Sequence, residues 1–289
     1  MIEILNIFYL LVICFLMFSF PLNNIYIKKK IAKYDLGIFE IYSTNIIFLL
    51  TLFLFFSFFN FDIIYLFLTI LSLALFNLFF FDWKIYKKQI ILLLILFLFL
   101  LSYSLEISTY PYLDWDASVN WIFKTLNFKS NYGFDNLKNV PGYVGYPHLG
   151  TYLWALFWKV SFIDYEYTGR FVFIFIYLLS FFTLVDNSKI STINKVILLI
   201  VIITICFDKI LLYGYQEPLM FSVCIIFVTL VEKITNKKNL YLNYTLLIFC
   251  ANLILWIKNE GMLILVLLNF FILFKKQITN KIKIILFSI

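Results

Sequence analysis

The sequence predicts an all-α, polytopic membrane protein, and three observations support this fold class. Of the 289 residues, 64% are hydrophobic and only 13% are charged, whereas soluble domains are nearer half apolar and a quarter charged. Apolar runs long enough to cross or nearly cross a bilayer recur along the chain, and lysines gather between alternate runs. We expect a bundle of about nine to ten spans that forms one integral membrane domain, residues 1–289, with no second domain.

The predicted spans form two groups. Four apolar runs precede a long polar interval and five follow it, at 4–20, 41–59, 63–81, 90–104, 171–185, 196–212, 219–231, 241–257 and 262–274. A tenth run begins at Ile284. The chain therefore divides into N-terminal spans (1–104), a large extracytoplasmic loop (105–169) and later spans (170–289), which we expect to be incomplete at the C-terminus.

The lysines predict the orientation of the spans. They form five clusters: Lys28, Lys29, Lys30 and Lys33; Lys84, Lys87 and Lys88; Lys189 and Lys195; Lys233, Lys237 and Lys238; Lys275, Lys276, Lys281 and Lys283. Loops rich in Lys and Arg remain cytoplasmic, so residues 60–62, 105–169, 213–217 and 258–261 fall on the outer side.

That alternation holds only if the apolar stretch 146–162 does not cross the membrane. We therefore expect it to be an interfacial helix on the outer surface, the second in the loop after one that starts near Asp116. Pro147 suits a first helical turn, and Tyr152, Trp154 and Trp158 are residues that favour lipid headgroups.

Several other classes of site and partner are excluded. The four cysteines lie in apolar runs without paired spacing, which argues against disulfides and structural zinc. One histidine cannot build a histidine-rich metal site, and there is no P-loop, dinucleotide-binding or HExxH motif. The net charge of +7 is explained by the membrane surface, so we expect membrane lipid and no nucleic acid as a partner.

The most polar stretch is 113–127, at the start of the loop. Asp114 and Asp116 begin a predicted helix, and steps of four from Asp116 reach Asn120 and Lys124 on the same face. A second, mostly apolar face carries Trp121, Ile122, Thr125 and Phe128. Asp116 is a candidate catalytic carboxylate, and the alternative is that it only caps the helix.

Charged residues from four segments are predicted to meet on the outer side. Besides Asp114, Asp116 and Lys124, they are His148, Arg170, Glu217, Lys258 and Glu260. Charges near the hydrocarbon boundary are costly unless they pair or serve a site. Each also has a structural alternative: a helix start for His148, an interface anchor for Arg170, helix-dipole stabilisation for Glu217 and a polar turn for 258–261.

Five short motifs follow one another in an order that resembles the GT-C superfamily of membrane glycosyltransferases, such as the dolichyl-phosphate-mannose-protein mannosyltransferases. They are Trp115-Asp116-Ala117 with Trp121 and Lys124; Tyr146-Pro147-His148-Leu149; Gly169-Arg170; Tyr215-Gln216-Glu217; and Lys258-Asn259-Glu260-Gly261. The resemblance covers about 111–261. It implies a donor sugar on a polyprenyl phosphate, Asp116 as the base, Tyr146 beside the substrate and an active site outside a bacterial inner membrane.

The expected chemistry is transfer of that sugar to a hydroxyl of a glycan, lipid or protein acceptor. A carboxylate would accept the hydroxyl proton, and Lys124, His148, Arg170 or Lys258 would offset the charge of the leaving phosphate. Alternatively, Asp114 and Asp116 bind a divalent cation that does so. We favour the base because the sequence has no other clustered carboxylates. Two further alternatives are a ligase or polymerase of lipid-linked glycans and a transporter or flippase.

Overall fold

A computed structural model describes residues 2–32, 36–142, 145–208, 212–236, 239–275, 278, 280 and 283–284. Lys33, Lys237, Lys238, Lys276 and Lys281 of the lysine clusters lie outside the described residues, as does nearly all of the run that begins at Ile284. Within the described part the all-α prediction is confirmed, since every regular element there is a helix.

Six helices are long and apolar enough to cross a membrane, as expected of an integral membrane protein. They are α3 (Ile38–Ser57), α4 (Ile63–Asn77, continued by a 3-10 turn to Phe80), α6 (Ile90–Thr109), α9 (Phe171–Asp186, preceded by a 3-10 turn, Glu166–Arg170), α11 (Glu217–Thr235) and α12 (Leu240–Ile257). Three shorter apolar helices are α1 (Ile2–Met17), α10 (Thr192–Cys206) and α13 (Gly261–Leu273). At about 1.5 Å per residue these fall short of a core of about 30 Å, so nine to ten spans stays a prediction.

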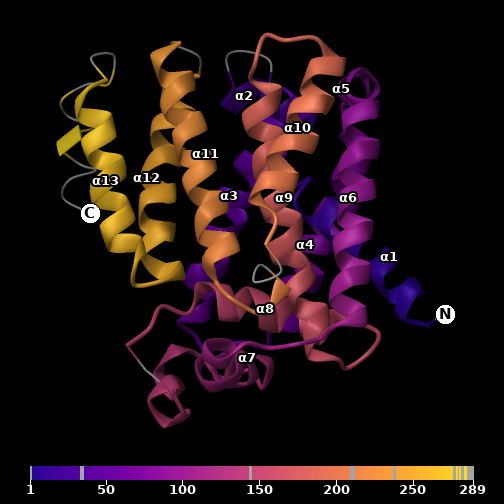
Figure 1. The fold of residues 1–289 in the computed structure, drawn as a ribbon, viewed down its shortest axis with the longest axis vertical. Helices are drawn as coiled ribbons and strands as arrows, with labels where there is room; N and C mark the ends of the chain where they lie inside the picture. Colours follow the sequence, from indigo (N-terminus) through magenta and orange to yellow (C-terminus); the bar gives the residue numbers. More distant parts are fainter. Residues whose placement is uncertain are drawn as a thin grey trace.

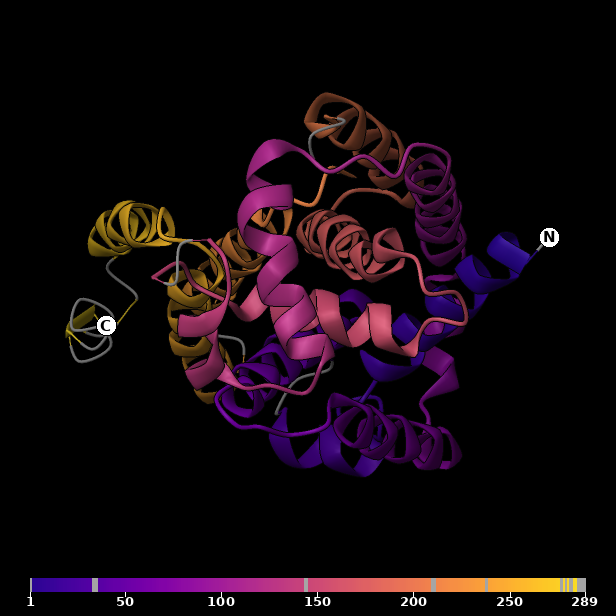
Figure 2. The same ribbon diagram turned by 90° about the horizontal axis from the view of Figure 1, so that it is seen from below.

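Helix α9 is the centre of the bundle. It contacts α3, α6, α10 and α11, and Figure 2 shows it enclosed by the other helices. Its side chains are apolar around the whole circumference, and all but the last turn is almost completely buried. A helix that is apolar on every side is typical of a protein interior or a membrane span, and for α9 the surrounding helices supply that apolar environment.

The segment that follows α6 lies across one end of the bundle, which we call the loop end (Figures 1 and 2). It contains a π-helical turn (Ala117–Trp121), α7 (Ile122–Lys129), a 3-10 turn (Phe134–Asn139) and α8 (Leu149–Val160). Helix α8 packs against the bundle on one side and against α7 on the other.

The burial of α8 differs from the surface position predicted for its aromatic residues. Tyr152 and Trp154 are 2% and 0% exposed, because their rings pack against Phe53, Phe128 and Phe173 instead of lipid headgroups. Gly169 permits this close packing, since a Cβ there would lie 2.4 Å from the Trp154 carbonyl oxygen. Helix α8 is thus a buried floor of the bundle.

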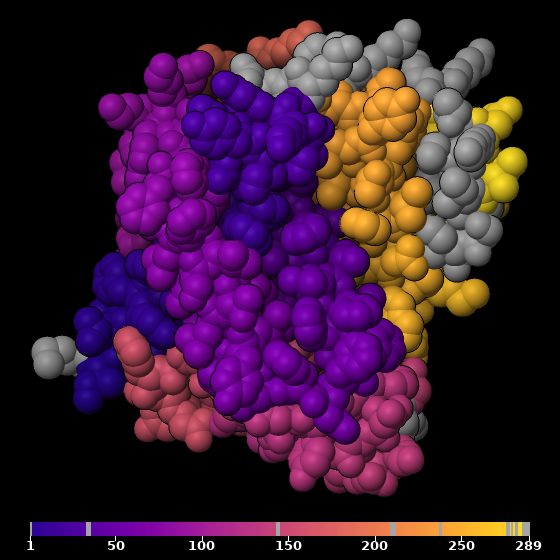
Figure 3. Space-filling view, turned by 180° about the vertical axis from the view of Figure 1, so that it is seen from behind, coloured from indigo at the N-terminus to yellow at the C-terminus, as the bar shows by residue number. Residues whose placement is uncertain are grey.

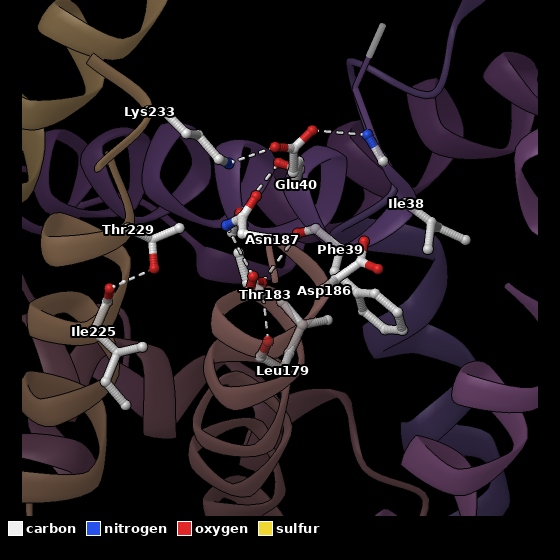
Figure 4. Close-up of polar contacts among 12 residues, drawn as sticks. Ile38, Phe39, Glu40, Leu179, Thr183, Asp186, Asn187, Ile225, Thr229 and Lys233 are labelled. Atoms are coloured by element: carbon white, nitrogen blue, oxygen red, sulfur yellow. Dashed lines mark hydrogen bonds and ion pairs between the residues drawn. The ribbon is translucent and has the colours of Figure 1, made fainter. Parts of the chain in front are cut away.

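The opposite end, which we call the lysine end, carries α2 (Ile25–Ile31), α5 (Trp83–Lys88) and the connections after α9 and α11 (Figure 1). A polar network holds three helices together there (Figure 4): Lys233 of α11 pairs with Glu40 of α3 at 2.9 Å, and the Thr183 hydroxyl of α9 donates to the Phe39 carbonyl at 3.1 Å. The described members of the first four lysine clusters belong to α2, α5, the end of α11, and the start of α10 with the connection before it. The side of a membrane that this end faces stays a prediction.

Candidate functional site

The π-helical turn fixes the carboxylate of Asp116. The Ile122 amide donates to the carbonyl of Ala117, five residues earlier, so the turn contains one residue more than an α-helical turn. This brings both Asn120 and Trp121 over Asp116: Asn120 Nδ2 donates to Oδ1 at 2.7 Å, and Trp121 Nε1 donates to Oδ2 at 2.7 Å. Each carboxylate oxygen keeps a lone pair for another partner.

Asp116 does not cap the helix, which was the alternative to a catalytic role. Its backbone is helical, with φ −64° and ψ −38°, and its side chain makes no capping hydrogen bond. Asp114 begins the helix instead, since its carbonyl accepts from the Ser118 amide at 2.8 Å and its carboxylate accepts from the Trp115 amide. The Asp116 side chain is therefore available for chemistry.

Two distant turns converge on the same region. Lys258, between α12 and α13, forms an ion pair with Glu217 at the start of α11 and lies 3.7 Å from Glu260. Burial opposes the charged form of Lys258, but the carboxylates of Glu217, Glu260 and Asp116 outweigh it and raise the pKa of this amine. The structure thus brings together residues from three of the four predicted segments.

Tyr215 joins this group from the turn before α11. Burial and then the carboxylates of Asp114, Glu217 and Asp116 raise the pKa of Tyr215 to about 12, so its phenol remains protonated and can donate a hydrogen bond. We call Asp114, Asp116, Glu217 and Glu260, together with Lys258 and Tyr215, the carboxylate cluster. Three of these carboxylates, Glu217, Glu260 and Asp116, act on the single lysine, so the negative charge of the cluster favours a positively charged ligand there.

Lys124 lies behind Trp121 rather than among the carboxylates. Its Nζ donates to the Tyr146 carbonyl at 2.6 Å and lies 5.7 Å and 5.9 Å from the ring centroids of Trp121 and Tyr146, which stack on each other. The side chain is 1% exposed, and burial lowers its pKa to about 8. The amine of Lys124 is thus enclosed by aromatic rings, and no contact with Asp116 is seen among its described partners.

His148 is a buried neutral side chain. Ser57 Oγ lies 2.7 Å from His148 Nε2 and donates to the Leu54 carbonyl, so it accepts the Nε2 proton. Burial, and secondly Lys124, lower the pKa of His148 to about 3. Four rings surround the imidazole: Phe58, Phe128, Phe134 and Trp256. At 0% exposure, this side chain ties α8 to α3 through Ser57.

Arg170 is likewise enclosed, and it holds two loops together. Its guanidinium pairs with Glu166 at 2.8 Å and donates to the carbonyls of Tyr112, at 2.8 Å, and Leu212. These carbonyls precede the segments that carry Asp114 and Tyr215. The side chain is 1% exposed, so it positions the carboxylate cluster from behind instead of binding an anion in it.

Sequence reasoning missed Trp121 and Tyr215 as members of the site. Trp121 was assigned to the apolar face because regular helical spacing turns it away from Asp116, and the π-helical turn changes that spacing. Tyr215 stands in the Tyr-Gln-Glu motif next to Glu217, which was the signal that could have identified it.

A divalent cation fits the donor type of this site but lacks a preformed set of ligands. Among the described residues, no group of three or more His, Cys, Asp or Glu side chains is arranged to hold a metal ion. Both oxygens of Asp116 already accept hydrogen bonds. Mg²⁺, however, often binds through one or two carboxylates together with substrate phosphates, a mode that Asp114 and Asp116 suit.

Comparison with known proteins does not identify a family for this chain. No protein-family model matches this chain, and no curated protein or solved structure matches it. The function must therefore be argued from the geometry of the cluster and the order of the motifs.

Proposed function

We propose that this protein is a glycosyltransferase that moves a sugar from a polyprenyl-phosphate-linked donor to an acceptor hydroxyl at the loop end of the bundle. The observation that carries the proposal is the convergence of 114–116, 215–217 and 258–260 in one cluster. Three of the motifs that resemble GT-C enzymes thus lie together, although about a hundred residues separate the first from the second and forty the second from the third.

Asp116 is the general base in this proposal. The acceptor oxygen forms a bond to the anomeric carbon, its proton passes to the Asp116 carboxylate, and the bond from that carbon to the phosphate oxygen breaks with its electron pair leaving on the polyprenyl phosphate. A single displacement of this kind inverts the anomeric configuration. Asn120 and Trp121 orient the carboxylate, which a base needs in order to meet the proton in line.

The excess of carboxylates in the cluster would repel the negatively charged leaving phosphate. The sequence favours a base over a metal because it has no other clustered carboxylates, but the structure adds Glu217 and Glu260 to the site. Lys258 alone does not balance the cluster, so a divalent cation held by Asp114 and Asp116 would supply the missing positive charge when bound. Transfer measured with and without a chelator decides between the two roles of this pair.

The roles first expected of Arg170 and His148 change in this proposal. Both groups are enclosed: the guanidinium bonds to Glu166 and two carbonyls, and the imidazole bonds to Ser57 through Nε2. We therefore assign them to positioning: Arg170 holds the loops of the cluster, and His148 holds α8. Lys124 supports Trp121 and Tyr146, at the rear of the site.

We infer the orientation of the protein in the membrane from the position of its lysines. If the lysine end is cytoplasmic, the carboxylate cluster faces outward from a bacterial inner membrane. Asp164 is a suitable reporter, because its side chain is 78% exposed at the loop end. A cysteine placed there should react with a membrane-impermeant maleimide in intact cells, and protection from the reagent would reverse the orientation.

The test of the function is transfer by the full chain in lipid nanodiscs, with sugar-labelled polyprenyl phosphates as donors. Asp116→Asn should lower the rate by at least about a thousandfold, in keeping with loss of a general base together with its charge. Trp121→Phe removes one hydrogen bond to a charged group, worth about 1.5 to 3 kcal/mol, and should cost about ten- to a hundredfold.

Asp164→Asn is the matched control, because it makes the same chemical change at the same end of the molecule, outside the cluster. It should keep wild-type transfer. Full transfer by Asp116→Asn, with insertion and stability unchanged, would contradict the assignment of the base.

A further inference from the structure

A second site lies at the lysine end, remote from the carboxylate cluster. A cavity of about 370 Å³ opens between α2, the start of α3 and α5. Its polar lining consists of Lys28, Gly37, Asp82, Lys84, Lys88 and Gln89. Figure 3 shows the indigo segment of α2 beside the purple segment of α5 at the top of the molecule, and a bridge between Asn24 and Phe81 joins them.

The described residues that line the cavity carry net positive charge. Lys28 pairs with Asp82 at 2.6 Å, which cancels that lysine and the only carboxylate among the lining residues just named. Lys84 and Lys88 are exposed, and among the described residues no carboxylate lies within ion-pair distance of either. Elsewhere at this end Lys195 and Lys233 are paired, with Asp186 and Glu40.

The two amides at the start of α3 already have acceptors and are not free to bind an anion. At the start of α3 the Gly37 amide donates to Glu40 and the Ile38 amide donates to the side-chain oxygen of Gln89. Gln89 is itself fixed, because its Nε2 donates to Asp186 at 2.7 Å. These bonds hold the walls of the cavity, and among the described residues that line it the Lys84 and Lys88 amines are the charged groups left to bind a ligand.

The surroundings indicate that the ligand has an apolar part. Next to the cavity, Trp83 and Tyr26 are 59% and 63% exposed, as expected of aromatic side chains at the level of lipid headgroups. Along α6, which starts directly after Gln89, Ile90, Ile91 and Leu94 are 49%, 55% and 57% exposed. An anion held by the lysines could extend its hydrocarbon along this apolar surface.

We propose that the cavity binds the headgroup of an anionic phospholipid, with its phosphate between Lys84 and Lys88 and its acyl chains along α6. Basic pockets at the ends of membrane helices are known to bind anionic headgroups. The inference does not depend on the proposed transfer reaction, since it uses other residues at the other end of the bundle. Inorganic or glycerol phosphate shares the headgroup chemistry but lacks the acyl chains.

The experiment is native mass spectrometry of the full-length protein in detergent, titrated with phosphatidylglycerol or with phosphatidylcholine of the same acyl chains. The wild type should retain phosphatidylglycerol with at least tenfold higher affinity than phosphatidylcholine. Lys84→Gln/Lys88→Gln should lower the phosphatidylglycerol affinity about tenfold or more and leave phosphatidylcholine unchanged.

Lys29→Gln/Lys30→Gln is the matched control, because it removes the same charge from exposed positions of α2 that do not line the cavity. It should change the affinity less than twofold. Equal loss in both double variants would mean that general surface charge attracts the lipid, and no loss in the cavity variant would remove the site. Both results overturn the proposal.

Soluble sn-glycerol 1-phosphate distinguishes the source of the phosphate. It should neither bind detectably at micromolar concentration nor displace phosphatidylglycerol. Binding as tight as that of the lipid would assign the cavity to a soluble phosphate and refute the lipid. All four substituted lysines are exposed or lie at short helices, and the unfolding midpoint of each variant should stay within a few degrees of wild type.

Discussion

Substitution of Arg170 separates the stability of the bundle from the geometry of its carboxylate cluster. In Arg170→Met, Glu166 loses its cation, and the carbonyls of Tyr112 and Leu212 lose their donor. Removal of one partner from a buried ion pair costs about 3 to 5 kcal/mol. At roughly 2 to 4 °C per kcal/mol for chains of this order of size, the unfolding midpoint should fall by about 6 to 20 °C.

The double variant Arg170→Met/Glu166→Met should recover much of that loss. It removes the uncompensated carboxylate, and apolar replacement of a buried ion pair is often close to neutral. The two carbonyls remain without their donor, which leaves a cost of about 1 to 3 kcal/mol. The double variant should therefore be more stable than Arg170→Met, although both variants lack the bonds from Arg170 to the Tyr112 and Leu212 carbonyls.

Hydrogen exchange is the measurement that reports the loops. Amides in 110–116 and 212–217 should exchange faster in both variants than in the wild type, because both lose the same two bonds. Glu166→Gln is the control: it loses the ion pair but keeps the bonds from Arg170 to the carbonyls, so exchange in these segments should be unchanged. Unchanged exchange in Arg170→Met, or a double variant no more stable than Arg170→Met, would refute the positioning role.

Two further predictions concern titration. Burial lowers the pKa of Lys124 from 10.5 to about 8, so the folded protein releases this proton at a lower pH than the unfolded protein. The stability of the wild type relative to Lys124→Met should therefore rise between about pH 8 and pH 10. The difference between their unfolding midpoints measures this, and a difference that stays constant over that range would contradict the burial argument. His148, with a pKa of about 3, should stay neutral from about pH 5 to pH 8. As the chain has one histidine, ¹⁵N-histidine NMR observes it alone, and a titration midpoint near 6.5 would show that the imidazole is accessible.

The elements of the bundle could be predicted well because they depend on long apolar runs. The run at 241–257 became α12, Leu240–Ile257, and the run at 90–104 became most of α6, Ile90–Thr109. Each span buries side chains that the sequence itself identifies as apolar. The lysines likewise indicated which segments share an end, so Glu217, Lys258 and the aspartates could be expected on the same side before any coordinates.

The individual roles in the site could not be predicted, because they depend on contact partners that residue type does not identify in the sequence. Arg170 binds two main-chain carbonyls, and any residue has a carbonyl. His148 is neutral because four aromatic rings from separate segments enclose it. The step of four from Asp116 to Asn120 agrees with an α-helix and with the observed turn alike, and only the structure distinguishes them.

The hydrogen bond from Trp121 to Asp116 depends both on the number of residues between them and on the π-helical turn. A π-helical turn is an α-helical turn with one residue inserted, so deletion of Ser118 or Val119, both exposed, would let the backbone relax to regular α-helical spacing. That deletion would place Trp121 four residues after Asp116 in a regular α-helix, so Trp121 and the residues that follow would keep their orientation toward Asp116. Loss of the π-helical turn without the deletion would instead rotate these residues by about 100° and turn Trp121 away from Asp116, so the length and the geometry of this stretch are matched.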